Sequence, residues 1–180
     1  FVGYNGNSGG HDDVFGYIFG YTDKASADIL TSSELNYTTQ YSTSYGYYIP
    51  ETILKVTITN QTNIPTNAFR NCDSIEEIVY TKGIETIGDS AFQNCTGITT
   101  IIDLSFATSI GSYAFSGCVN LNVGILENAV NLKTIGFSAF ENCTFTELTL
   151  PSKLETIGGY AFDVCTKLTD IVLPSKLTSL

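Results

Sequence analysis

The chain has 180 residues, of which 43 % are hydrophobic, so it can bury a core and does not have a disordered composition. Its formal net charge of -10 at pH 7 repels the phosphates of nucleic acids and anionic membranes, so neither is an expected partner. No apolar run reaches the ~20 residues that span a membrane, and the single histidine leaves little material for acid–base or metal chemistry.

Residues 1–52 differ in composition from the rest of the chain. They hold 8 of the 11 tyrosines, and a run of Ser, Thr and Tyr covers 38–48. Tyrosine combines a large apolar area with a polar tip, so this segment is a candidate ligand contact, for example for a carbohydrate. Alternatively, these rings cover the N-terminal side of the regular coils that follow. The candidate tyrosines are Tyr41, Tyr45, Tyr47 and Tyr48.

One local cluster in this segment, His11 with Asp12 and Asp13, has ligand potential. Neighbouring side chains on an extended chain point to opposite sides, so these three do not converge on one point. We interpret them as a solvated turn and expect no metal and no cofactor. The chain also contains no GxSxG nucleophile elbow, and its Gly-rich stretch lacks the lysine of a phosphate loop. We therefore do not expect an enzyme.

From residue 53 to residue 180 the chain repeats itself about every 23 residues. Each of five Ala-Phe pairs follows an isoleucine at a constant offset, and glycine comes directly after that isoleucine in four copies. Each pair is also followed three residues later by a cysteine. These cysteines are all that the chain has: Cys72, Cys95, Cys118, Cys143 and Cys165.

The copy at 154–176, LETIGGYAFDVCTKLTDIVLPSK, indicates what one repeat builds. Its LTDIVLP part alternates like a half-buried strand with Ile171 and Leu173 inward, and Pro174 ends the strand. The AFxxC part predicts one short helical turn. A single coil cannot bury its own apolar face, so neighbouring coils must stack. The fold class is therefore an α/β repeat, a leucine-rich-repeat-type solenoid with one strand and one short helical turn per coil.

The pattern LxxIGxxAFxxCxxLxxIxLP resembles the BspA-like leucine-rich repeats of bacterial and protozoan surface proteins over about residues 53–180. Three copies depart from it, of which the fourth is one residue short after Cys143. Two extra residues around 123–125 leave the strand register of the third copy ambiguous, and Asp103 at a core leucine position predicts that Leu104 turns inward. The resemblance implies an extracellular or cell-surface bacterial protein of the adhesin type that contacts host extracellular matrix or cell-surface proteins.

The outward side chains of the strands form a candidate ligand-binding surface. If Ile171 and its counterparts face the core, the alternate residues point outward, and stacking at ~4.8 Å aligns them in one column. In curved solenoids such a column lies on the concave surface, where these proteins usually bind. Alternatively, the column is a solvated sheet face. Its members are Lys55, Thr57, Glu77, Val79, Thr100, Ile102, Glu147, Thr149, Asp170 and Val172.

The even spacing of the cysteines places one in each coil and forms no CxxC pair, which argues against a metal site. Free cysteine is among the most buried residue types, so we expect five reduced thiols in the core. Disulfides between neighbouring coils are the alternative.

We expect residues 1–52 to be one enlarged, irregular N-terminal repeat, and residues 53–180 to hold five copies truncated in a sixth. The missing initial methionine and signal peptide predict a fragment of a longer protein. Three functional hypotheses follow: a non-catalytic protein-binding module, a passive stalk that displays other domains, and carbohydrate binding through the tyrosine-rich segment. The oligomeric state stays open.

Overall fold

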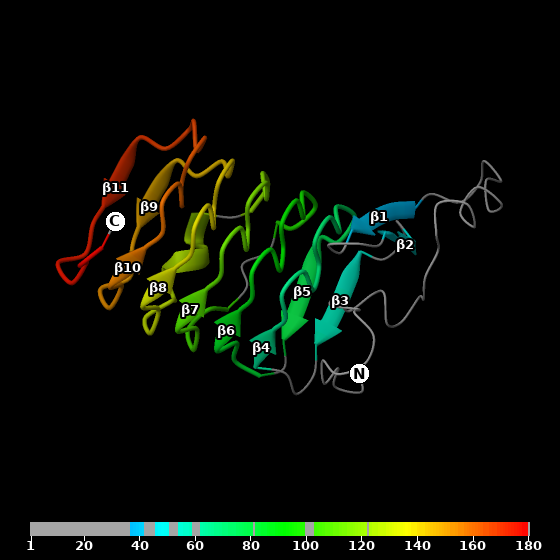
Figure 1. Cartoon of the computed structure of the whole chain (residues 1–180), viewed down its shortest axis with the longest axis horizontal. Coiled ribbons are helices and arrows are strands. Elements are labelled where there is room, and N and C mark those ends of the chain that lie inside the picture. The colour runs from blue at the N-terminus through cyan, green and yellow to red at the C-terminus, as the bar shows by residue number, and fades with distance from the viewer. Residues whose placement is uncertain are drawn as a thin grey trace.

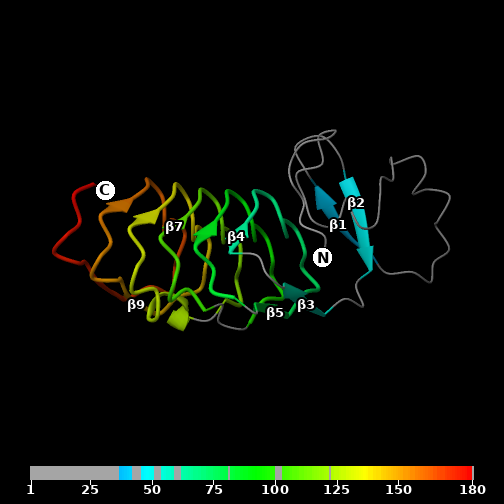
Figure 2. The ribbon, with the colours of Figure 1, turned by 90° about the horizontal axis from the view of Figure 1, so that it is seen from below.

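The coils stack into an elongated solenoid, which confirms the predicted architecture (Figure 1). The structure is a computed structural model that describes residues 37–41, 46–50, 54–58, 62–80, 82–99, 103–121 and 123–179. Within this part of the chain, short strands lie on two opposite sides of the stack. Figure 2 shows β4 and β7 along one side and β3, β5 and β9 along the other.

The first side is a parallel sheet that has five strands in the described residues, four from the Ile-Gly motifs and one that ends at Ile64, before Pro65. In every strand the first side chain faces outward and the isoleucine is buried. A bridge between Thr156 and Ser179 adds the start of the next coil, as the truncated sixth copy predicts. The strands are β4 (Asn63–Ile64), β6 (Thr86–Ile87), β7 (Ser109–Ile110), β8 (Thr134–Ile135) and β10 (Thr156–Ile157).

The opposite side consists of two separate pairs of parallel strands in the described residues. β3 (Lys55–Ile58) pairs with β5 (Glu77–Tyr80), and β9 (Glu147–Thr149) pairs with β11 (Asp170–Val172). The third copy contributes no strand here. Its two extra residues lie at the 3₁₀ helix η2 (Val123–Leu126).

The third copy keeps its apolar positions inside the solenoid although it lacks the strand. Ile125 and Leu126 of η2 are fully buried. As predicted, Leu104 is buried while Asp103 is exposed. A helix therefore takes the place of the ambiguous strand without opening the core.

The prediction of a helical turn at AFxxC is wrong. In the first copy the amides of Phe69 and Asn71 donate to carbonyls of the next coil, at 2.7 Å each, whereas the intervening amides bond three residues back. An α-helix would need every amide to bond four residues back within its own coil. The bonds between coils require a left-handed backbone twice per coil, with φ of 58° at Asn67 and 59° at Asn71.

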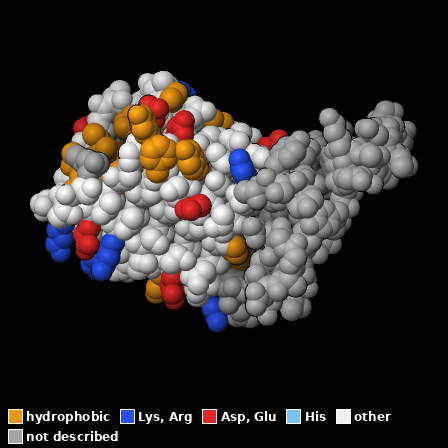
Figure 3. Space-filling model, viewed as in Figure 1, with side chains coloured by type: hydrophobic (Ala, Val, Ile, Leu, Met, Phe, Trp, Pro, Cys, Tyr) orange, Lys and Arg blue, Asp and Glu red, His pale blue; other side chains and the backbone are white. Residues whose placement is uncertain are grey.

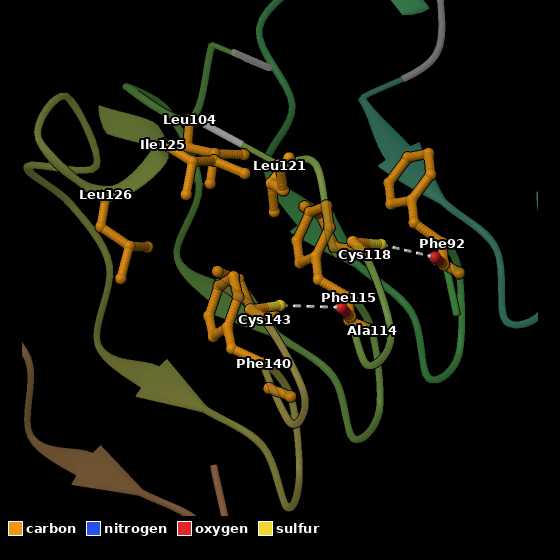
Figure 4. Close-up of a cluster of buried hydrophobic side chains, with 14 of the residues drawn as sticks. Phe92, Leu104, Ala114, Phe115, Cys118, Leu121, Ile125, Leu126, Phe140 and Cys143 are labelled. Carbon is orange, nitrogen blue, oxygen red and sulfur yellow. Dashed lines mark hydrogen bonds between the residues drawn. The ribbon is translucent and has the colours of Figure 1, made fainter. Parts of the chain in front are cut away.

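Stacked phenylalanines form the centre of the core. The rings of the five Ala-Phe motifs lie 5.2–5.6 Å apart and 2–14° from parallel. All five cysteines are free and buried, as predicted. Four of the thiols donate to a phenylalanine carbonyl of the preceding coil, for example Cys118 to Phe92 at 2.9 Å and Cys143 to Phe115 at 3.3 Å (Figure 4).

Upstream of the array, β1 (Tyr37–Tyr41) and β2 (Gly46–Pro50) form an antiparallel hairpin with Tyr37 opposite Pro50. Most of residues 1–52 lie outside the described residues, so their assignment to one enlarged repeat stays a prediction. In the part of the chain that is described, no helix is long and apolar enough to span a membrane.

Candidate binding surfaces

The outward residues of β3 and β5 form the first part of the candidate surface. The strand register places Lys55 beside Glu77 and Thr57 beside Val79. The Lys55 ammonium lies 2.8 Å from the Glu77 carboxylate, and both side chains are about half exposed, at 54 % and 40 %. An exposed pair of this kind adds little to stability. It does neutralise the carboxylate, so this end of the surface carries little net charge.

A groove of about 740 Å³ adjoins this pair of strands. Leu54 and Glu76, which directly precede β3 and β5, both line it. The rest of the described lining consists of hydroxyl, carboxyl and amide side chains and one glycine, and is therefore mostly polar. These residues are Asp73, Ser74, Thr96, Gly97, Thr99 and Asn120.

The outward residues of β9 and β11 form the second part of the candidate surface. The strand register places Glu147 beside Asp170 and Thr149 beside Val172, and all four side chains are exposed. The two carboxylates come from adjacent strands, which lie ~4.8 Å apart, so their charges repel. No lysine or arginine forms an ion pair with either of them in the described residues. This end of the surface is therefore acidic.

The inward orientation predicted for the alternate residues is confirmed at Val56, Ile78 and Leu148, which are buried. The last strand differs, because Ile171 is 39 % exposed and Leu173 is 52 % exposed. Ile171 lies in β11, the last described strand, which has a neighbour on one side only, and Leu173 directly follows that strand.

The ten predicted residues do not form one continuous column in the described structure. Thr100 and Ile102 lie outside the described residues, and the third copy has η2 where a strand was expected. The structure therefore brings together two groups of four residues, one on β3 and β5 and one on β9 and β11. In the sequence, η2 lies between the two groups. The two extra residues of the third copy were the sequence signal for this break.

The tyrosine candidates are not tested. Tyr41 lies in β1, and Tyr47 and Tyr48 lie in β2, but their side chains are outside the described part, as is Tyr45. The same is true of His11, Asp12 and Asp13. Among the described residues, no group of three His, Cys, Asp or Glu side chains could hold a metal ion.

Sequence reasoning missed a second set of aromatic residues. Tyr113, Phe137 and Tyr160 come from three successive coils and form a ladder of edge-to-face rings at the surface. Each lies two or three residues after the isoleucine of its Ile-Gly motif. An aromatic residue at the same or the adjacent repeat position in three successive copies was the signal that could have revealed them.

These features define a leucine-rich-repeat solenoid. Residues 25–122 and 102–180 match the family model of the BspA type leucine rich repeat region, in 6 copies. The chain belongs to this family.

Solved structures support the fold. A leucine-rich repeat protein from Bacteroides ovatus is 28 % identical with a TM-score of 0.57, and the match covers 79 % of this chain and 34 % of that one. The chain thus spans about a third of that protein. A leucine-rich repeat protein of T. pallidum is 21 % identical with a TM-score of 0.61, over 82 % of this chain and 79 % of that one.

A leucine-rich cell-surface protein from Faecalibacterium prausnitzii is 25 % identical with a TM-score of 0.48, over 74 % of this chain and 45 % of that one. No curated protein matches the chain.

Proposed function

We propose that this chain is a non-catalytic protein-binding module of a secreted or cell-surface bacterial protein, and that it contacts host matrix or cell-surface proteins. Its membership of a repeat family supports this proposal, since solenoids bind mainly through their extended surfaces. The observation that carries it is the exposed face of β9 and β11, where Glu147 and Asp170 are side by side.

A basic partner surface would relieve the repulsion between these two carboxylates. Complementary charge accelerates encounter and discriminates against acidic partners. Thr149 and Val172 continue the same face with a hydroxyl and an apolar contact. The neutral Lys55–Glu77 pair at the other end would add contacts that depend less on charge.

The test is binding to a panel of immobilised extracellular matrix proteins at low and high salt. The double variant Glu147→Lys/Asp170→Lys should weaken low-salt binding about 10-fold or more, because it reverses the steering charge. High salt should weaken wild-type binding, since the carboxylates are exposed and screened.

The matched control is Glu85→Lys/Glu155→Lys, which changes the net charge equally. Glu85 and Glu155 are exposed and precede β6 and β10 on the opposite side of the stack. This variant should retain most of the binding. Equal loss in both variants would show a non-specific charge effect and would contradict the proposed site.

The second candidate function is a passive spacer. It is favoured by the continuous stack of Phe rings and by the bonds from coil to coil, which make a rigid rod. A spacer predicts no saturable binding to any matrix protein at either salt concentration.

A further inference from the structure

The aromatic ladder of Tyr113, Phe137 and Tyr160 has a regular geometry along the solenoid axis. The ring centroids of Tyr113 and Phe137 are 5.5 Å apart, and those of Phe137 and Tyr160 are 5.4 Å apart. Neighbouring ring planes meet at 63° and 68°. The ladder therefore advances by one ring per coil. It runs at the surface of the solenoid, in the same direction as the stack of buried Phe rings in the core.

Two of the three ladder rings are exposed, and the exposure of Phe137 does not arise from a position at the end of the stack. Phe137 is 40 % exposed although it has an aromatic neighbour on each side, and Tyr160 is 67 % exposed. Figure 3 shows hydrophobic side chains gathered over this C-terminal half of the described residues. Exposed aromatic side chains that cluster in this way mark a contact surface.

The repeat does not need aromatic residues at these positions. Tyr113 and Tyr160 adopt left-handed φ values of 56° and 59°, in a position that Asn67, Ser90 and Ser138 occupy in the other copies. Asn tolerates this conformation, whereas a bulky side chain there is strained. Strained residues that the fold does not require cluster at binding sites.

The charged side chains identified beside the ladder are carboxylates. Residues 111–121, 136–140 and 158–162 contain no Asp, Glu, Lys or Arg. The Asp89 carboxylate of the preceding coil accepts a hydrogen bond from the Ser112 amide at 2.7 Å, and Glu141 and Asp163 directly follow two of these segments. The tyrosine hydroxyls can donate and accept hydrogen bonds. The ladder therefore offers apolar faces and polar groups, but these neighbours supply no cation that would recognise an anionic ligand.

We propose that the ladder binds a neutral, unbranched oligosaccharide whose sugar rings lie along Tyr113, Phe137 and Tyr160. The apolar C–H face of a pyranose stacks on an aromatic side chain while its hydroxyls bond to neutral polar groups. One pyranose and its glycosidic oxygen advance by about one coil, so successive sugars stay in step with the rings. Because neighbouring ring planes meet at 63° and 68°, a sugar that lies flat on one ring is followed by one that contacts the edge of the next ring. An extended peptide presents side chains to one face every ~6.7 Å and does not keep this step.

The test is calorimetric titration of the whole chain with cellohexaose, maltohexaose and chitohexaose, with hexagalacturonate as the anionic counterpart. At least one neutral hexasaccharide should bind, and hexagalacturonate should not, because the protein carries a net charge of -10. Phe137→Ala, with its fold verified by urea unfolding, should weaken the binding at least 10-fold.

Tyr113→Asn and Tyr160→Asn separate a binding role from a structural one. Each should weaken binding about 10-fold while leaving the urea midpoint unchanged or higher, because Asn suits the left-handed backbone. Ser90→Asn is the matched control, since it introduces the same residue at the equivalent left-handed position of a coil outside the ladder. It should leave the affinity unchanged.

Several results would overturn the proposal: no binding of any neutral hexasaccharide at millimolar concentration, undiminished binding in all three ladder variants, or equal binding of hexagalacturonate. The proposal would also be wrong if the ladder variants lost binding to a matrix protein and the wild type bound no sugar. The protein-binding function proposed above is tested on other residues, so each proposal can fail without the other.

Discussion

At the scale of single residues, the glycine of each Ile-Gly bend is needed because two backbones approach closely. A Cβ atom at Gly136 would lie 2.5 Å from the carbonyl carbon of Gly111 and 2.5 Å from the amide nitrogen of Ser112. These are backbone atoms of the preceding coil. Hydrogen bonds between the backbones of adjacent coils hold them in place, so they cannot move aside. Gly159 is different, since a Cβ there would meet only the Phe137 ring, at 3.6 Å.

We therefore predict that Gly136→Ala lowers the free energy of unfolding by about 2–3 kcal/mol, as overpacking does. Gly159→Ala is the matched control and should change it by less than about 0.5 kcal/mol. Urea unfolding followed by circular dichroism measures both values. Equal stability of the two variants would show that adjacent coils can separate at this bend.

At the scale of elements, the AFxxC segments and the Ile-Gly strands bond to the next coil. Alternate amides of the first four AFxxC segments donate to the next coil, and four of the thiols donate to the preceding coil. The spacing of Ala, Phe and Cys also fits a helical turn, so the sequence of one copy could not distinguish the two structures. The bonding groups of the neighbouring coil decided between them.

The central ring of the Phe stack tests this coupling. Phe115 is fully buried and stacks on Phe92 at 5.2 Å and on Phe140 at 5.3 Å. Phe115→Ala should cost about 3–5 kcal/mol, since it leaves a cavity between two coils. It should also broaden the urea transition, because the coils on either side then unfold more independently.

Phe162→Ala is the control for this prediction. Phe162 is only partly buried and stacks on one ring, Phe140, at 5.6 Å. It should cost less than half as much as Phe115→Ala. A similar loss for both residues would contradict the view that stacking on two sides sets the stability of a coil.

At the scale of the whole molecule, the thiols form a column along the core that makes stability depend on pH. Burial raises the pKa values of Cys95, Cys118 and Cys143, and the neighbouring thiol of the column raises each of them further. The same thiols titrate near ~8.5 in an unfolded chain. Above that pH the unfolded state loses protons that the folded state keeps, so the free energy of unfolding falls as pH rises.

The expected fall approaches about 1.4 kcal/mol per pH unit for each of these three thiols. Urea unfolding between pH 7 and about pH 10 measures it. Cys118→Ala should reduce the slope by up to about 1.4 kcal/mol per pH unit, whatever its effect on stability at neutral pH. An unchanged slope would show that the thiols do not control the alkaline limit.

The sequence by itself determined the repeat, its length, the side chains of the core and the family. Each copy must bury the same few apolar residues, so register alone reveals Ile64, Phe69 and Cys72 as core positions. It also predicted correctly that Leu104 turns inward.

Only the tertiary structure decided three other features: the backbone of the AFxxC segment, the replacement of one strand by η2, and the aromatic ladder. Each depends on which groups of the neighbouring coil are within reach. A sequence pattern describes one coil at a time, whereas hydrogen bonds and ring contacts in this protein are made mainly between coils.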